Sequence, residues 1–155
     1  MEKIIEEIGI KTDLAKVIIT SIENIHGRLA TIFTYLGDTG INIFAIMGFS
    51  TSKKHADIAF MIKNTDADKV VELISAKIKE IKGSSVLIDR EIAFFSLYGR
   101  KLAITSGLAG KIFASVAELG ISIEDVTTCL NAFSFTVPKQ NAKEVQNKLT
   151  HDFLR

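Results

Sequence analysis

The chain has 155 residues, 47% of them hydrophobic and 24% charged, which is the balance of a globular protein with a substantial core. Its formal net charge of +1 argues against nucleic-acid and anionic-membrane partners, because such partners require a strong basic field. A single cysteine, Cys129, excludes an internal disulfide, and the acidic N-terminus "MEKIIEEIGI" is unlike a signal peptide. We therefore expect a cytoplasmic protein with no membrane or nucleic-acid partner.

Strand and helix patterns alternate from the first third of the chain onward. Residues 17–22 are β-branched and apolar, which predicts a strand, and apolar side chains at helical spacing predict a helix over residues 28–37. Gly40 follows as a natural helix stop. Residues 41–49 then predict a second strand, with Ile41, Ile43 and Ala45 on one face and Asn42, Phe44 and Ile46 on the other.

The following segment completes one structural unit. After the turn-rich "STSKKHAD", the stretch "IAFMI" (58–62) predicts a strand, and residues 66–81 predict a helix capped within residues 64–66. The stretch "SSVLID" (84–89) closes the unit as a fourth strand. The resulting order, βαββαβ, is that of the ferredoxin-like fold.

The same order recurs because the sequence is duplicated. The residues repeated at an offset of 80 are Gly27, Ile32, Phe33, Gly40, Ile41 and Ile43, which recur as Gly107, Ile112, Phe113, Gly120, Ile121 and Ile123. The flanking strands and the second helix repeat at an offset of 75. This pattern predicts two units of about 65 to 75 residues, each near the lower size limit of a domain.

The second unit lacks its closing strand. Its predicted elements are strands over 92–97, 121–128 and 132–137 and helices over 108–118 and 140–150. The final "THDFLR" is too short to return as a strand, whereas residues 3–10 have an extended pattern and no place in the first unit. We therefore expect an α+β fold of two ferredoxin-like units, residues 11–90 and residues 91–155 plus 1–10, with the N-terminal strand completing the second sheet.

Two long segments carry a resemblance to a known family. The first unit contains "VIITSIENIHGRLATIFTYLGDTGINIFAIMGFS", and the second contains "FFSLYGRKLAITSGLAGKIFASVAELGISIEDVTTC". The pair resembles tandem ACT domains, which are amino-acid-sensing modules, and more specifically the C-terminal regulatory region of aspartokinase. Gly99, Arg100, Thr127 and Thr128 match motifs of its second unit, and the resemblance covers about residues 8–155.

The resemblance implies a non-catalytic module that binds lysine or threonine and controls an aspartokinase-type activity. It implies a small amino acid as effector, a homodimer paired through sheet edges, and a kinase domain or subunit as a further partner. The implied effector-binding residues are Asn24, Ile25, His26, Gly27, Arg28, Leu29, Ile41 and Asn42. The equivalent loop of the second unit comprises Ser106, Gly107, Leu108, Ala109, Ile121 and Ser122.

Physical chemistry favours the same loops independently. A glycine before a helix lets backbone amides approach an anion at the positive end of the helix, and Gly27 and Gly107 take that position. Where the family loop commonly reads Asp-x-Pro-Gly, His26 and Ser106 stand at the proline position. The alternative function is therefore a ligand-free module that mediates dimerisation or another interaction.

Catalytic and metal-dependent functions find little support in the sequence. Glu124 and Asp125 are neighbours on a predicted strand and point to opposite faces, so they cannot form a carboxylate dyad. The three histidines lack the paired spacing of a zinc site. We expect no catalytic residues, no cofactor and no metal.

Overall fold

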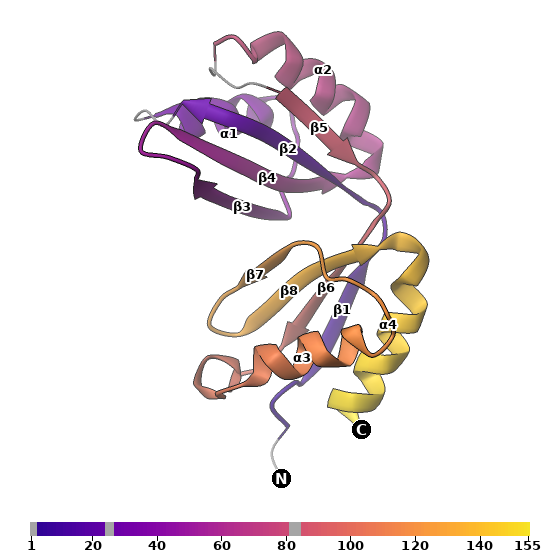
Figure 1. Cartoon of the computed structure of the whole chain (residues 1–155). Helices are drawn as coiled ribbons and strands as arrows, with labels where there is room; N and C mark the ends of the chain where they lie inside the picture. Colours follow the sequence, from indigo (N-terminus) through magenta and orange to yellow (C-terminus); the bar gives the residue numbers. More distant parts are fainter. Residues whose placement is uncertain (1–2, 24–26, 81–84) are drawn as a thin grey trace. The chain divides into compact units, whose positions relative to one another are not determined.

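The computed structural model describes residues 3–23, 27–80 and 85–155, and it divides the chain into two compact units (Figure 1). The first unit comprises Asp13–Arg90. The second unit comprises Met1–Thr12 together with Glu91–Arg155.

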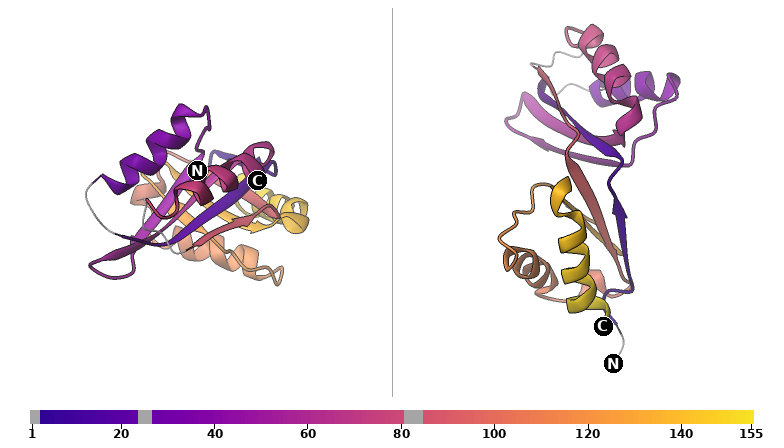
Figure 2. Two further views of the ribbon diagram at one scale, coloured as in Figure 1. Left: turned by 90° about the horizontal axis from the view of Figure 1, so that it is seen from above. Right: turned by 90° about the vertical axis from the view of Figure 1, so that its right-hand side faces the viewer.

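The first unit is a four-stranded sheet with two helices on one face (Figure 2). Its elements are β2 (Leu14–Glu23), α1 (Arg28–Asp38), β3 (Ala45–Ser50), β4 (His55–Lys63), α2 (Ala67–Lys77) and β5 (Ser85–Asp89). The strand order is β3-β4-β2-β5, and all neighbours are antiparallel. The core between sheet and helices contains Val17, Ile19, Ile32, Leu36, Phe60, Val70 and Ile74. The predicted βαββαβ order is confirmed.

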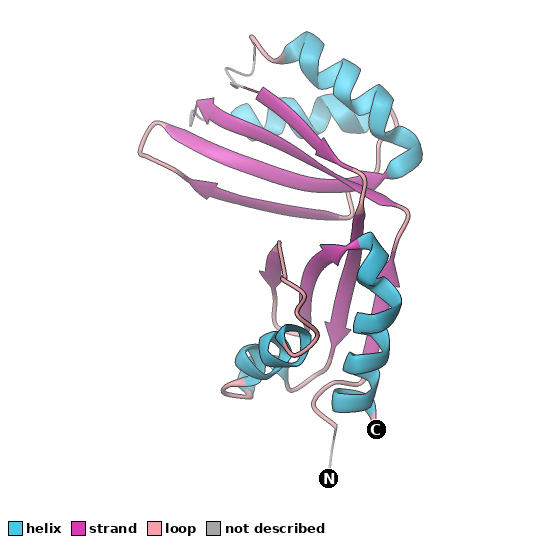
Figure 3. Ribbon diagram, turned by 45° about the vertical axis from the view of Figure 1, so that its right-hand side comes forward, coloured by secondary structure: helices cyan, strands magenta, loops and turns pink. Residues whose placement is uncertain are grey.

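The second unit repeats this arrangement (Figure 3). Its elements are β1 (Glu7–Lys11), β6 (Ile92–Tyr98), α3 (Leu108–Ala117), β7 (Val126–Thr128), β8 (Ala132–Pro138) and α4 (Ala142–Leu149), and a π-helical turn over Thr150–Leu154 follows α4. The strand order is β1-β6-β8-β7. Its core includes Phe95, Ile112, Val116, Phe135, Val145 and Leu149.

The N-terminal strand completes the second sheet, as predicted. β1 runs antiparallel to β6, with pairs from Glu7↔Tyr98 to Lys11↔Phe94. It therefore takes the place that β5 takes beside β2 in the first unit. The strand is shorter than the predicted 3–10, but the preceding segment still packs on the unit, since Ile5 is 1% exposed.

The repeated glycines end and begin helices in both units. Gly27 and Gly107 precede α1 and α3 with φ of 80° and 77°, and Gly40 and Gly120 follow those helices with φ of 81° and 72°. These left-handed conformations favour glycine, which has no Cβ.

The predicted strand over 41–49 is wrong in its first residues. The Ile41 N–H donates to the Leu36 carbonyl (3.1 Å) and the Gly40 N–H to the Gly37 carbonyl (2.9 Å), which together form a Schellman motif. Residues 41–44 therefore form the connection that follows α1, and the paired residues of β3 begin at Ala45. The second unit shows the same correction, because β7 covers only Val126–Thr128 of the predicted 121–128.

Candidate effector site

The N-terminus of α1 lies at the corner that follows β2. Gly27 is the N-cap residue of α1, and no side chain among the described residues caps the helix. The Gly27 carbonyl accepts bonds from the Thr31 N–H (2.9 Å) and the Thr31 hydroxyl (3.0 Å). The first amides of α1 are left available to an anion at the positive end of the helix. Asn24, Ile25 and His26 lie outside the described residues.

Arg28 connects the start of α1 to the end of β2 and to the segment after α2. Its guanidinium donates from Nη2 to Glu23 Oε2 (3.2 Å) and from Nη1 to the Glu80 carbonyl. Its side chain is only 20% exposed, and its charge is balanced by Glu23. An effector carboxylate would thus meet backbone amides here before it meets a free guanidinium, while Leu29 offers an exposed apolar side chain beside them.

Ile41 and Asn42 lie at the opposite end of α1. The helix has 11 residues and is about 16 Å long. The strand register also places the two segments at opposite ends of the sheet. Ala45, the first residue of β3, lies level with Met61 and Lys16, near the start of β2. Glu23, the last residue of β2, pairs with His55 at the other end. Ile41 is buried, and Asn42 is exposed. A single unit therefore does not bring Asn42 to the Gly27 corner.

The second unit divides its equivalent residues in the same way. Ser106, Gly107 and Ala109 are exposed at the start of α3, whereas Leu108 is buried in the core. Half-buried Ile121 and exposed Ser122 lie beyond the end of that helix. Each unit thus divides its predicted binding residues between the two ends of one helix, the two predicted half-sites, and the first unit has the longer polar side chain, Asn42, in the second of them.

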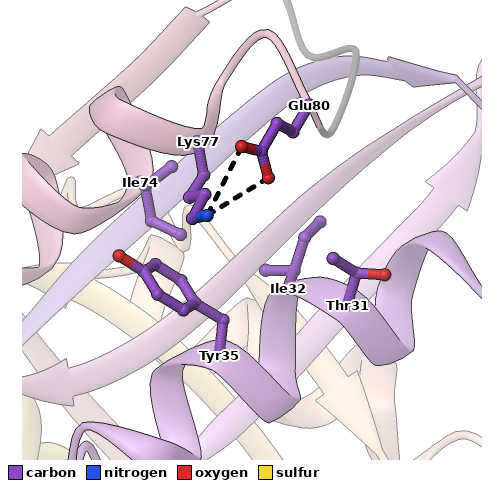
Figure 4. Close-up of a pocket in the computed structure, with 6 residues that line it drawn as sticks. All are labelled: Thr31, Ile32, Tyr35, Ile74, Lys77 and Glu80. Carbon is purple, nitrogen blue, oxygen red and sulfur yellow. Dashed lines mark hydrogen bonds and ion pairs between the residues drawn. The ribbon is translucent and has the colours of Figure 1, made fainter.

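A cleft between α1 and α2 of the first unit was not predicted from the sequence. It has a volume of about 90 Å³ and is lined by Thr31, Ile32, Tyr35, Ile74, Lys77 and Glu80 (Figure 4). The Lys77 ammonium lies 3.2 Å from Glu80 Oε2 and 5.2 Å from the centre of the Tyr35 ring. Its walls therefore combine apolar side chains with one cation and one anion.

The corresponding place between α3 and α4 is filled by a polar network. The Ser115 hydroxyl donates to Asp152 Oδ2 (2.7 Å), and Asp152 Oδ1 lies 2.9 Å from His151 Nδ1. Lys148 Nζ bridges Asp152 (3.1 Å) and Glu118 (2.6 Å). His151, Ser115 and Lys148 lower the pKa of Asp152 to about 2.

This network predicts an acid-sensitive contribution to stability. Because the folded-state pKa of Asp152 is below its ordinary value of 3.8, its contribution is present above that value and is lost as the pH falls toward 2. We expect Asp152→Asn to lower the free energy of unfolding by about 1 kcal/mol at pH 6, allowing for solvent screening, and by much less at pH 2.5. Urea denaturation of both proteins across this range measures the difference; a pH-independent difference would contradict the prediction.

The described residues contain no group of three or more histidine, cysteine, aspartate or glutamate side chains placed to hold a metal ion. None of the helices in the described part of the chain is both long and apolar enough to cross a membrane.

Comparison with known proteins finds a family match within the first unit. Residues 16–81 match the family model of the ACT domain. The aspartokinase of Geobacillus stearothermophilus is 27% identical over 124 residues, which cover 80% of this chain and 30% of that protein. The chain spans about a third of the length of such curated relatives.

Solved structures extend the likeness to both units. The regulatory subunit of aspartate kinase from Thermus thermophilus, in a ligand-free form, is 25% identical with a TM-score of 0.87, and the match covers 97% of this chain and 99% of that chain. E. coli aspartokinase III, in complex with lysine and aspartate, shares the fold with a TM-score of 0.74 at 18% identity, over 99% of this chain and 34% of that chain.

The first unit matches the ACT-domain family model, and the second unit repeats the same strand order. The chain resembles the regulatory part of aspartokinase, as the near-complete coverage of the isolated regulatory subunit shows.

Proposed function

We propose that this chain senses a small amino acid, lysine or threonine, and thereby controls an aspartokinase-type activity. The observation that carries the proposal is the N-terminus of α1 behind left-handed Gly27, which no described side chain caps and which suits an effector carboxylate. The lysine bound in the structure of E. coli aspartokinase III supports the choice of effector class.

The separation of the half-sites favours a homodimer. One effector cannot touch both the Gly27 corner and Asn42 of the same unit, but a second copy in antiparallel orientation brings its own Asn42 to that corner. β3 is an edge strand whose exposed apolar side chains include Ile46 (52%) and Phe49 (67%), and pairing of such edges covers their backbone groups. Effector binding then selects one arrangement of the dimer, which acts on a kinase domain or subunit.

A ligand-free assembly module is the second candidate. The replacement of the loop proline by His26 and Ser106 favours it, as does the apolar β3 edge, because assembly needs the edge and not the corner.

A thermal-shift screen of the 155-residue chain against the twenty amino acids distinguishes these functions. We expect lysine or threonine at about 100 times its Kd to raise the Tm by about 5 °C or more. Asn42→Ala should abolish the shift, whereas the matched variant Ser122→Ala should retain it. A dimer that shows no shift with any amino acid would establish the assembly module instead.

A further inference from the structure

The two units differ at one equivalent point between their helices. α1 and α3 align at their N-cap glycines, Gly27 and Gly107, so Tyr35 corresponds to Ser115. α2 and α4 align at Ala67 and Ala142, and the same offset matches Lys77 at the end of α2 to Asp152 in the π-helical turn after α4. In the second unit these positions meet in the Ser115–Asp152 hydrogen bond of 2.7 Å. In the first unit the same positions enclose the cleft of about 90 Å³. The fold can therefore fill the space between its two helices with side chains, as the second unit does, so the cleft is a feature of the first unit.

The charges of the cleft are available to a ligand. The side chains of Lys77 and Glu80 are 36% and 63% exposed, and an exposed ion pair of this kind contributes little to stability. The pair can therefore open without a large loss of stability. Once open, it presents an ammonium and a carboxylate a few ångströms apart, above a wall formed by Ile32, Ile74 and Tyr35 (Figure 4).

We propose that this cleft binds a small zwitterionic α-amino acid of the size of glycine, alanine or serine. The ligand carboxylate pairs with Lys77 and its ammonium with Glu80, so both charges remain balanced, which a singly charged ligand does not achieve. A cavity of about 150 Å³ holds benzene, so this smaller cleft accommodates only the polar head and one or two carbons.

The cleft is distinct from the effector corner but connected to it through Glu80. The Glu80 side chain borders the cleft, while its carbonyl accepts from Arg28, the first residue of α1. Arg28 in turn pairs with Glu23 at the end of β2. A ligand that draws the Glu80 side chain away from Lys77 therefore acts on a residue that anchors the corner, and occupancy of the cleft modulates effector binding there.

Titration of the ¹⁵N-labelled 155-residue chain with glycine, L-alanine and L-serine tests this site by NMR. We expect saturable shifts of the amides of Thr31, Tyr35, Ile74 and Lys77. Lys77→Met keeps most of the aliphatic side chain and should weaken binding about tenfold or more, because it removes a charged hydrogen-bond donor. The exposed neighbour Lys79 does not line the cleft, so Lys79→Met is the matched control and should bind as the wild type does.

The remaining outcomes decide the proposal. Acetate and methylamine should each bind at least about tenfold more weakly than glycine, since each leaves one charge unpaired. Absence of saturable shifts, or equal affinity in Lys77→Met, would overturn the site. If Lys77→Met does not fold, Glu80→Gln supplies the same test through the ligand ammonium. Asn42→Ala should leave this binding intact, so a failure here is separable from a failure of the effector proposal.

Discussion

Gly99→Val is expected to detach the N-terminal segment from the second unit and to lower the free energy of unfolding by about 3 kcal/mol or more. A Cβ at Gly99 would lie 1.8 Å from the Ile4 carbonyl oxygen and 3.5 Å from Ile5 Cα. The clash is with backbone, so no side-chain rotation relieves it. Ile4 cannot withdraw without pulling the buried Ile5 from the core, and Gly99 is itself held by its N–H bond to the Asn131 carbonyl (3.0 Å).

Gly110→Ala provides the matched control for this substitution. Gly110 lies within α3 of the same unit, and a Cβ there would meet nothing within 4 Å. Alanine is the better helix former, so this variant should be neutral or up to about 1 kcal/mol more stable. Urea denaturation gives both free energies, and amide spectra report whether β1 remains paired with β6. A Gly99→Val protein with wild-type stability and an intact β1 would show that the N-terminal segment has another way to dock.

The docking of β1 illustrates what the sequence alone could predict. Each copy of a duplicated unit should contain the same number of strands. The second unit lacks its last strand and residues 3–10 have no place in the first unit, so these residues could be assigned to the second sheet. The glycines were equally informative, because Gly27 and Gly40 each stand where a helix begins or ends. The glycine positions depend on local conformation, and the missing strand follows from the number of elements in a repeat. The sequence alone is enough to predict both.

The start of β3 could not be predicted in this way. Ile41 and Ile43 are spaced two residues apart, as on one face of a strand, but their burial comes from packing on the core after the Schellman turn. Strand pairing depends on a partner, and the residue pairs of β3 with β4 begin at Ala45, next to the bond from the Phe44 N–H to the Met61 carbonyl (2.9 Å). Asn42 and Gly27 are separated because one follows the end of α1 and the other precedes its start. Residues close in sequence therefore lie a whole helix length apart.

The helix cleft was missed for a different reason. Tyr35 and Lys77 are far apart in sequence, and each is unremarkable on its own helix. Comparison with the equivalent positions, Ser115 and Asp152, indicates that the space between the two helices differs from one unit to the other. The sequence does not reveal which pair of side chains fills this space and which leaves it open.

Phe60→Ala is expected to lower the free energy of unfolding by about 3 to 5 kcal/mol, because it removes a fully buried aromatic side chain and leaves a cavity. Phe60 lies in the centre of β4, and the Phe33 ring of α1 packs edge-on against it at a centroid distance of 5.4 Å. Loss of this contact removes part of the support that holds α1 on the sheet.

The same substitution should therefore affect the proposed effector binding as well as stability. Both half-sites depend on α1, since the Gly27 corner precedes its first turn and the Asn42 segment follows its last. We expect Phe60→Ala to weaken effector binding even at temperatures where the protein stays folded, whereas Leu87→Ala, an exposed site on β5, should change stability by less than about 0.5 kcal/mol and leave binding intact. Urea denaturation and calorimetric titration with the effector measure the two effects. Unchanged affinity in folded Phe60→Ala would mean that the half-sites are held by their loops and by the partner copy, and that the position of α1 on its own sheet does not set the affinity.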